Sequence, residues 1–139
     1  MNRYGFDELQ IGHEESFDVR ITAENMEAFL KITGDVNPLH NDDSYAVKKG
    51  FDQRVVYGLL SASYFSTLVG VYLPGEKCLI EETEYKFTKP VYVGDELTIC
   101  GKIAEKDERV KQLTIKVRAR RKGDGASVIR GTMKVGVLD

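Results

Sequence analysis

The sequence has few residues of the kinds that build disulfide scaffolds or metal centres. It contains two cysteines, Cys78 and Cys100, among 139 residues. Two are too few for a disulfide framework, and their spacing does not match a metal site, so we expect free thiols. The first ten residues are polar and acidic and lack the apolar core of a secretory signal peptide. These absences predict a cytoplasmic protein without a bound metal.

The composition excludes several protein classes. Hydrophobic residues make up 42% and charged residues 30%, which argues against a disordered chain, a collagen-like repeat or a coiled coil. The length fits one domain over residues 1–139. Residues 55–75 carry no charge, a length close to that of a membrane span. Glycine, serine and threonine dilute its hydrophobicity and Pro74 ends it, so we expect a buried helix instead.

Charge is distributed unevenly along the chain, although the formal total is −2. Residues 1–46 hold ten acidic and three basic residues, whereas residues 102–134 hold eleven basic and four acidic residues. Such an asymmetry can attract phosphates of a cofactor, an acidic carrier protein or a nucleic acid. It is equally compatible with a solvated sheet face that pairs with the acidic half.

Helical patterns occupy the first half of the chain. Apolar residues recur at three and four residues over 22–33, with Thr22 as the N-cap and Gly34 at the end. A second short helix is expected over about 43–49. A longer helix is expected from Gly58 to Tyr72, where apolar or small residues cover every side. We therefore expect other structure to enclose this helix.

Alternation with a period of two dominates the second half and predicts strands. A first strand is expected over 15–21. Four more follow, around 84–88, 97–103, 113–120 and 129–137, and turn signals separate them. We expect these four to form an antiparallel meander in chain order. Its apolar face needs a cover, and the helix from Gly58 is the suitable candidate, which predicts an α+β sheet curled around one helix.

The loop after Gly34 holds the best candidates for acid–base chemistry. Asp35 and His40 flank Asn37 and Pro38, and the proline restricts how the loop can move. Histidine titrates near neutrality, so an aspartate–histidine pair facing one cavity can transfer protons. On residue types alone, another reading stays open: Asp35 accepts backbone hydrogen bonds and His40 packs or caps the next helix. The other histidine, His13, is expected at the surface.

The start of the long helix offers a second element of a site. Backbone N–H groups at a helix N-terminus are free to donate, and Gly58 has no side chain to block their approach. Such a site suits a thioester carbonyl that becomes an enolate. A purely structural role for Gly58, in allowing a sharp turn, is equally open on this evidence.

The ordered set of these motifs resembles the MaoC-like (R)-specific enoyl-CoA hydratases. The stretch FLKITGDVNPLH over 29–40, followed by Ala46, resembles their hydratase-2 signature. The resemblance continues through VYGLL over 56–60, LPG over 73–75 and FTKPVYVGD over 87–95. It extends over nearly the whole chain in the same order. The resemblance implies the hot-dog fold, a sheet wrapped around a long helix, in a homodimer or dimer-based oligomer with active sites at the subunit interface.

The resemblance also implies roles for individual residues. Asp35 and His40 would add water across the 2,3 double bond of a trans-2-enoyl thioester, giving an (R)-3-hydroxyacyl product, or catalyse the reverse dehydration. The Gly58 amide would polarise the thioester oxygen, and Asn37 would order the loop and the water. Ser66 matches a helix serine near the catalytic loop. One departure is Tyr57, where many members have histidine; we expect it to alter pocket shape or substrate preference.

The carrier of the acyl group and the class of reaction each have more than one candidate. The resemblance requires no metal or redox cofactor, and coenzyme A or the phosphopantetheine of an acyl carrier protein would belong to the substrate. We expect no nucleic-acid or membrane partner. A hot-dog acyl-CoA thioesterase is one alternative. A non-catalytic acyl-thioester sensor, or a nucleic-acid-binding module that uses the basic strands, is another, but no recognition helix or interleaved aromatic residues accompany those bases.

Overall fold

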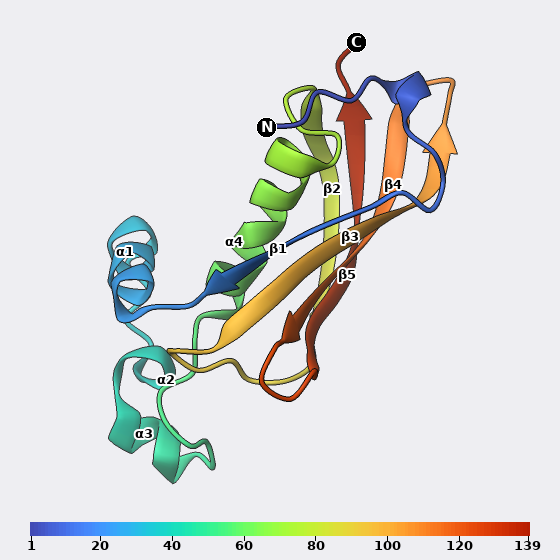
Figure 1. Ribbon diagram of the computed structural model, residues 1–139. Helices are drawn as coiled ribbons and strands as arrows, with labels where there is room; N and C mark the ends of the chain where they lie inside the picture. The colour runs from blue at the N-terminus through green and yellow to red at the C-terminus, as the bar shows by residue number, and fades with distance from the viewer.

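The computed structural model describes residues 1–139 as a curled antiparallel sheet with one long helix against it and a small helical group at one end (Figure 1). The strands are β1 (Glu14–Arg20), β2 (Cys78–Phe87), β3 (Glu96–Asp107), β4 (Gln112–Arg121) and β5 (Ser127–Val137). The helices are α1 (Ala23–Thr33), α2 (Pro38–Asn41), α3 (Asp43–Lys48) and α4 (Gly58–Thr67). A 3₁₀ turn, η1, spans Phe6–Glu8, and a π-helical segment, η2 (Leu68–Tyr72), continues α4. The predicted α+β architecture is confirmed.

The strand order is β1-β3-β4-β5-β2, so the prediction of a four-strand meander is wrong for β2. This strand pairs with β5 at the far edge of the sheet, and only β3, β4 and β5 follow one another as neighbours. The connection over residues 88–95 is too long for a tight hairpin. It bonds instead to other segments: the Val91 carbonyl accepts from the Val56 amide at 2.8 Å, and the Gly94 amide donates to the Ile21 carbonyl at 2.8 Å.

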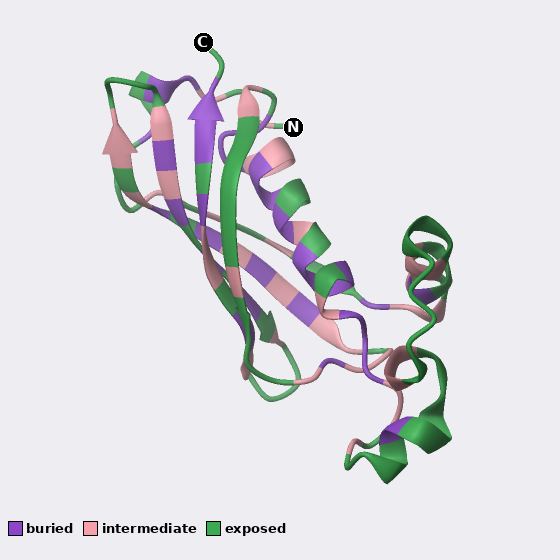
Figure 2. Cartoon of the chain, turned by 180° about the vertical axis from the view of Figure 1, so that it is seen from behind, coloured by how far each residue is buried: buried purple, intermediate pink, exposed green.

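Helix α4 lies across one face of the sheet, as the covering helix was expected to do (Figure 2). A side chain at Gly101 of β3 would begin 2.8 Å from the Leu68 methyl group, so this glycine permits the close approach of helix and sheet. The expectation that α4 is enclosed on every side is wrong. Its outer side is exposed at Leu59, Ser63, Ser66 and Thr67. No helix of the structure is long and apolar enough to span a membrane.

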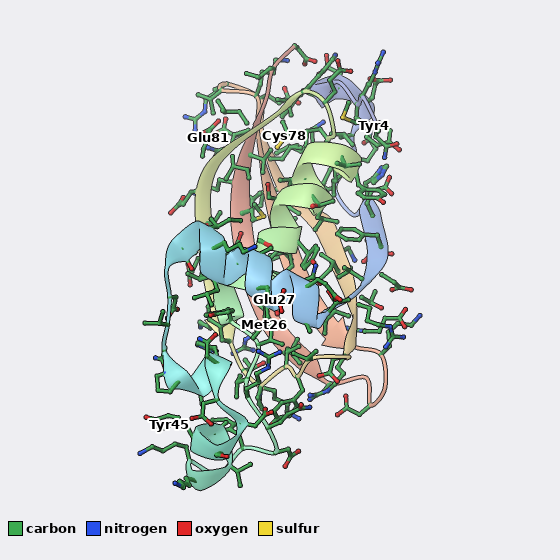
Figure 3. All side chains as sticks on the ribbon, turned by 90° about the vertical axis from the view of Figure 1, so that its left-hand side faces the viewer. Tyr4, Met26, Glu27, Tyr45, Cys78 and Glu81 are labelled. Atoms are coloured by element: carbon green, nitrogen blue, oxygen red, sulfur yellow. The ribbon has the colours of Figure 1, made fainter.

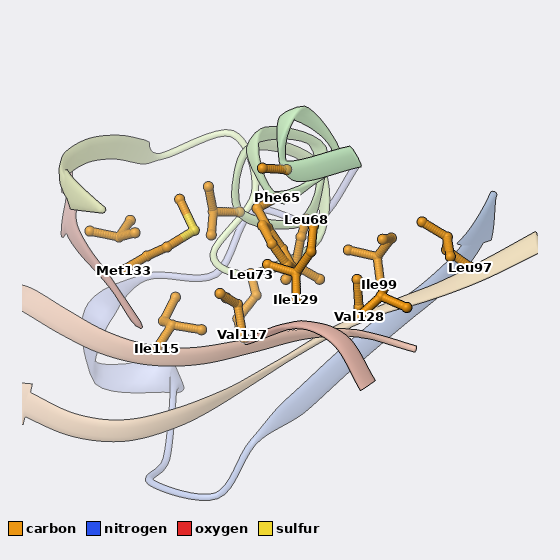
Figure 4. Packing of buried hydrophobic residues seen from close by; sticks show 14 of the residues in the cluster. Phe65, Leu68, Leu73, Leu97, Ile99, Ile115, Val117, Val128, Ile129 and Met133 are labelled. Atoms are coloured by element: carbon orange, nitrogen blue, oxygen red, sulfur yellow. The ribbon is translucent and has the colours of Figure 1, made fainter. Parts of the chain in front are cut away.

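One hydrophobic cluster of 25 buried residues joins α4, η2 and the sheet (Figure 4). Phe65, Leu68 and Leu73 enter it from the helical side. Alternate residues of the sheet meet them; they include Leu97, Ile99, Ile115, Val117, Ile129 and Met133. Burying each such side chain stabilises the fold by about 1.5–3 kcal/mol. The core therefore holds the first turn of α4 in a fixed place at one end of the sheet.

The helices α1, α2 and α3 form a separate group beside that end (Figures 1 and 3). Thr22 caps α1 as predicted, since its hydroxyl accepts from the Asn25 amide at 3.1 Å. Gly34 ends α1 with a φ of 69°. The sequence predicted a loop over 35–40, but Asn37 caps a short helix over Pro38–Asn41, with Pro38 in its first turn. This helix, α2, carries His40.

Candidate active site

Asp35 lies in a tight turn between α1 and α2, and its carboxylate is exposed. One oxygen, Oδ1, accepts a hydrogen bond from the Asn37 amide at 3.1 Å. The Asn37 side chain in turn accepts from the Leu39 amide at 2.9 Å. These two Asx-type bonds hold the turn that carries the carboxylate. The other oxygen of Asp35 makes no hydrogen bond and is available to a water or a ligand.

His40 is partly buried, and its ring has a defined orientation. Its Nδ1 lies 2.7 Å from the Val55 carbonyl oxygen. A carbonyl only accepts hydrogen bonds, so Nδ1 carries the hydrogen and Nε2 of the neutral ring carries the free lone pair. His40 therefore presents a proton acceptor on the side away from Val55.

Gly58 begins α4, and the backbone amides of Gly58 and Leu59 make no hydrogen bond within the protein. These are the free donors that every helix N-terminus has. A side chain at Gly58 would begin 3.0 Å from the ring carbons of Phe87. Glycine thus allows Phe87 of β2 to pack beside the free amides.

A cavity of about 310 Å³ brings His40, Gly58 and Ser61 together. The rest of its wall is mainly apolar: Phe51, Val55, Val56, Phe87, Thr88, Lys89, Pro90, Val91 and Ile129. Ser61 is 1% exposed, and its hydroxyl has no hydrogen-bond partner in the protein. A mainly apolar cavity with a base, the free Gly58 amide and a hydroxyl can bind an acyl group and polarise its carbonyl.

Tyr57 connects the parts of this site. Its ring centroid lies 4.4 Å from that of His40. Its hydroxyl donates to the Asp35 backbone carbonyl at 2.7 Å and accepts from the Asn41 side chain at 3.0 Å. The residue is 2% exposed. Motif reasoning singled out Tyr57 only as a departure from the family, and it missed Asn41 and Ser61. Ser61 had a weak signal, a small polar residue three positions after Gly58 on the buried side of α4.

The pair of Asp35 and His40 was expected to face one cavity, but the cavity wall includes His40 and neither Asp35 nor Asn37. Asn37 stands in the Asp35 turn, next to it in the loop. Ser66 lies on the exposed side of α4, two turns beyond Gly58, and does not line the cavity. His13 is outside the site, where its Nε2 lies 3.1 Å from a Glu15 carboxylate oxygen.

The cysteines and carboxylates show no second catalytic centre. Both thiols are free, and burial raises the pKa of Cys78 to about 11 and also raises the pKa of Cys100. Since the thiolate is the reactive form, neither residue is activated as a nucleophile. No group of three or more histidine, cysteine, aspartate or glutamate residues is arranged to hold a metal ion.

Comparison with known proteins identifies the family. The family of MaoC-like domains matches residues 8–125. The chain is 33% identical to an (R)-specific enoyl-CoA hydratase from Aeromonas caviae over 111 residues, 78% of this chain and 83% of the relative. An (R)-specific enoyl-CoA hydratase from Rhodospirillum rubrum is 30% identical over 105 residues, 73% of each chain.

Solved structures agree with the sequence comparison. The structure of the (R)-hydratase of A. caviae involved in PHA biosynthesis superposes with a TM-score of 0.88 and 32% identity, covering 93% of this chain and 97% of the other. An (R)-hydratase from Pseudomonas aeruginosa in the unliganded form gives a TM-score of 0.89 and 26% identity, covering 96% and 85%. The fold, the ordered motifs and these matches lead to one conclusion. The chain belongs to the family of MaoC-like domains.

Proposed function

We propose that the protein hydrates trans-2-enoyl thioesters to (R)-3-hydroxyacyl thioesters, or catalyses the reverse dehydration. The observation that carries the proposal is the orientation of His40. Its Nδ1 is bound to the Val55 carbonyl, which leaves Nε2 as an acceptor on a residue that lines the same cavity as Gly58. The names of the relatives from A. caviae and R. rubrum support this reaction class.

In this mechanism, Asp35 and His40 hold one water molecule between the free carboxylate oxygen and Nε2. The water oxygen bonds to C3 of the enoyl group while the pair accepts one of its protons. The pair returns a proton to C2, so the enzyme ends in its starting protonation state. Water addition neither oxidises nor reduces the substrate, and the proposed chemistry therefore requires no redox cofactor.

The negative charge that develops during the addition resides on the thioester oxygen. The Gly58 amide donates to that oxygen, and the partial positive charge of the α4 N-terminus adds to its stabilisation. Asn37 keeps the Asp35 turn in shape. Ser66, on the outer side of α4, reaches a substrate only if the acyl chain leaves the cavity along that side.

The acyl group is carried by coenzyme A or by the phosphopantetheine arm of an acyl carrier protein, which present the same thioester. The cavity walls around Gly58 are apolar and suit the acyl and pantetheine chains.

We also propose that the functional unit is a homodimer. Strand β2 is a sheet edge, and its apolar side chains Leu79, Ile80 and Phe87 are 50%, 40% and 49% exposed. Leu59 on the open side of α4 is 65% exposed. An exposed apolar edge strand needs a cover, and a second copy of the chain supplies one.

The test is to mix the purified protein with crotonyl-CoA and follow the ultraviolet absorbance of the conjugated enoyl thioester. We expect the absorbance to fall and (R)-3-hydroxybutyryl-CoA to form. Asp35→Asn and His40→Gln should each lower kcat by roughly 10²–10⁴-fold, because each removes one proton acceptor. His13→Gln is the matched control, since it removes the only other histidine at a position outside the cavity.

Two results contradict the proposal. The first is near-wild-type turnover in either the Asp35 or the His40 variant. The second is release of free thiol from acyl-CoA without hydration of crotonyl-CoA, longer enoyl-CoA substrates or enoyl acyl carrier protein, which identifies a thioesterase.

A further inference from the structure

Tyr57 is linked to three parts of the proposed catalytic apparatus: the turn that carries Asp35, the ring of His40 and the start of α4. Its hydroxyl binds the Asp35 carbonyl at 2.7 Å, its ring lies 4.4 Å from the His40 ring, and its backbone immediately precedes Gly58. We propose that Tyr57 is a positioning residue that sets the relative placement of the Asp35 carboxylate, the His40 ring and the Gly58 amide. This inference rests on the proposed function.

Three features allow Tyr57 to act in this way. It is 2% exposed, and its ring also packs against Phe29 of α1 at 4.7 Å between centroids, so the ring has little freedom. Its hydroxyl both donates, to Asp35, and accepts, from Asn41. The Asn41 side chain in turn donates to the Asn37 carbonyl at 2.9 Å. A single buried hydroxyl therefore holds both ends of the loop that carries Asp35.

The hydroxyl bond is the specific part of this arrangement. Asp35 is exposed, and the bonds that its turn makes are local. The bond to Tyr57 is the contact that ties its backbone to the helix on which Gly58 lies. If Tyr57 only fills space, Tyr57→Phe keeps the ring packing and leaves the reaction unchanged.

The experiment compares Tyr57→Phe with Tyr72→Phe. Tyr72 is a matched control, because its ring is also stacked, on Phe17 at 5.1 Å, and its hydroxyl makes no hydrogen bond. We expect Tyr57→Phe to lower kcat by about 10–100-fold while KM changes by less than about threefold, since a small misplacement of catalytic groups slows chemistry more than binding. Tyr72→Phe should retain wild-type kcat.

A second readout separates this proposal from the proposed function. Amide hydrogen exchange at Asn37 and Leu39 reports the order of the loop without any substrate. We expect exchange at these amides to be about tenfold faster in Tyr57→Phe than in the wild type and unchanged in Tyr72→Phe. Unchanged exchange together with unchanged kcat overturns the positioning role. An inactive wild type with the exchange difference intact refutes the proposed function and leaves the loop-holding role standing.

A second inference comes from the face of the sheet opposite α4. Cross-strand pairs there place Arg118 of β4 directly opposite Arg130 of β5, and Arg130 directly opposite Lys86 of β2. Arg120 lies two residues along the same face of β4. We call these four residues the basic cluster. Like charges in directly opposed pairs destabilise a sheet.

Two nearby cations have carboxylate partners and Lys116 donates to the Thr132 hydroxyl at 3.2 Å, whereas the basic cluster has no partner. Lys134 lies 3.5 Å from Glu82, and Lys122 lies 2.9 Å from Asp18. No side chain of the basic cluster makes an ion pair or a hydrogen bond. The charge of the basic cluster is therefore unpaired within the chain and available to an anion from outside it.

The shape of the surface indicates which anion fits. The basic cluster lines a hollow of about 950 Å³ together with Lys102 and Lys116, and no aromatic side chain lines it. Three glutamates, Glu14, Glu15 and Glu84, also line the hollow, but none of them forms an ion pair with the basic cluster. Arginine forks bind phosphate oxygens in pairs. Without aromatic rings on which bases stack, the hollow suits a compact polyphosphate better than a nucleic acid. The structure assigns this hollow as a binding site for the phosphates of a small polyphosphate or nucleotide.

The probes are inorganic tripolyphosphate, ATP and coenzyme A, titrated calorimetrically at about 0.15 M salt, where diffuse surface attraction is largely screened. We expect binding to the wild type and at least a tenfold loss of affinity in Arg118→Gln/Arg130→Gln. Lys134→Gln/Lys122→Gln is the matched control, since it removes the same charge from cations that have partners. It should retain the wild-type affinity.

The three probes distinguish the source of the phosphates. Preference for coenzyme A assigns the hollow to the substrate's nucleotide end, and preference for ATP or tripolyphosphate assigns it to a separate ligand. Absence of binding by all three probes overturns the site, as does an equal loss in the control variant. Tighter binding of a DNA duplex, with a salt dependence that reports many phosphate contacts, also overturns it in favour of a nucleic-acid surface.

Discussion

The hydroxyl of Ser61 is buried in an apolar wall and has no hydrogen-bond partner. A buried polar group without a partner costs about 1–3 kcal/mol of stability. Such a cost is common at functional sites, where a ligand supplies the missing bond. Ser61 lines the cavity beside Gly58 and His40, so under the proposed function we expect an atom of the substrate to complete its bonding.

The variant Ser61→Ala should therefore lose activity without losing stability. We expect the free energy of unfolding to stay unchanged or to rise by about 1 kcal/mol, because the variant removes an unsatisfied hydroxyl. We expect kcat/KM on crotonyl-CoA to fall by about tenfold, which corresponds to one lost hydrogen bond to the substrate. Urea denaturation and initial rates measure the two quantities. Ser63→Ala is the control, since its hydroxyl already donates to the Leu60 carbonyl at 2.6 Å. Lower stability with unchanged kcat/KM in Ser61→Ala contradicts this view.

At the scale of the element, the contact between α4 and β3 depends on Gly101. The place that a Cβ atom would take lies 2.8 Å from a methyl carbon of Leu68 and 3.1 Å from one of Ile115. Both neighbours are fully buried in the core. Neither can move away without displacing other core side chains, because protein interiors are closely packed.

We predict that Gly101→Ala destabilises the protein by about 1–3 kcal/mol, the usual cost of overpacking a core. Chemical denaturation measures the change. Gly123→Ala is the control: it adds the same methyl group in a turn where nothing lies within 4 Å of the new atom. If both variants unfold at the same denaturant concentration as the wild type, the helix–sheet distance is not limited by Gly101.

The elements also show which features a sequence pattern predicts. Thr22 and Gly34 predicted both ends of α1, because a cap and a left-handed glycine act within one helical turn. The position of β2 was predicted wrongly, since strand order depends on contacts between distant segments. The candidate active site shows the same difference between local and long-range features. Asp35, His40 and Gly58 belong to local motifs, whereas the roles of Tyr57, Asn41 and Ser61 depend on distances that only the folded chain defines.

At the scale of the whole molecule, the two ends of the chain meet at the same end of the sheet (Figure 1). The Asp139 carboxylate accepts from Lys77 Nζ at 3.0 Å and from the Phe6 amide at 3.2 Å. The bond from Lys77, followed by the bond from Phe6, lowers the pKa of Asp139 below its ordinary value of 3.8. Elsewhere, Lys122 and then Thr98 lower the pKa of Asp18 through hydrogen bonds.

The lowered pKa values of these carboxyl groups determine whether stability rises or falls with pH. A carboxyl group with a lower pKa in the folded state contributes stability above its unfolded pKa, and this contribution is lost as the pH falls through the folded value. We expect Asp139→Asn to be less stable than the wild type at neutral pH, by an amount that shrinks as the pH falls below the ordinary carboxyl pKa of 3.8. Urea midpoints at several pH values measure the difference. A difference that stays constant down to pH 2 shows that the charge of Asp139 is not responsible.

The exposed apolar residues on the open side of the molecule support the proposed homodimer. Ile80 on β2 and Leu59 on α4 are 40% and 65% exposed, and they lie on the edge strand and on the uncovered side of the central helix. Isolated exposed apolar residues occur on any protein, but here they lie on or beside an edge strand whose outer side has no partner strand, next to the candidate active site. If a second copy covers this side, the dimer and the catalytic site depend on the same surface.

We therefore predict that the wild type sediments with twice the chain mass of 15.6 kDa. The double variant Leu59→Lys/Ile80→Lys should sediment as a monomer, because two buried cations without partners disrupt an apolar interface. Activity on crotonyl-CoA should fall with the dimer fraction, and it should recover when a higher protein concentration restores the dimer. Val110→Lys is the control, since Val110 is 63% exposed in the turn between β3 and β4 and not on the β2 edge. A wild type that is monomeric and fully active would show that the exposed edge does not serve dimerisation.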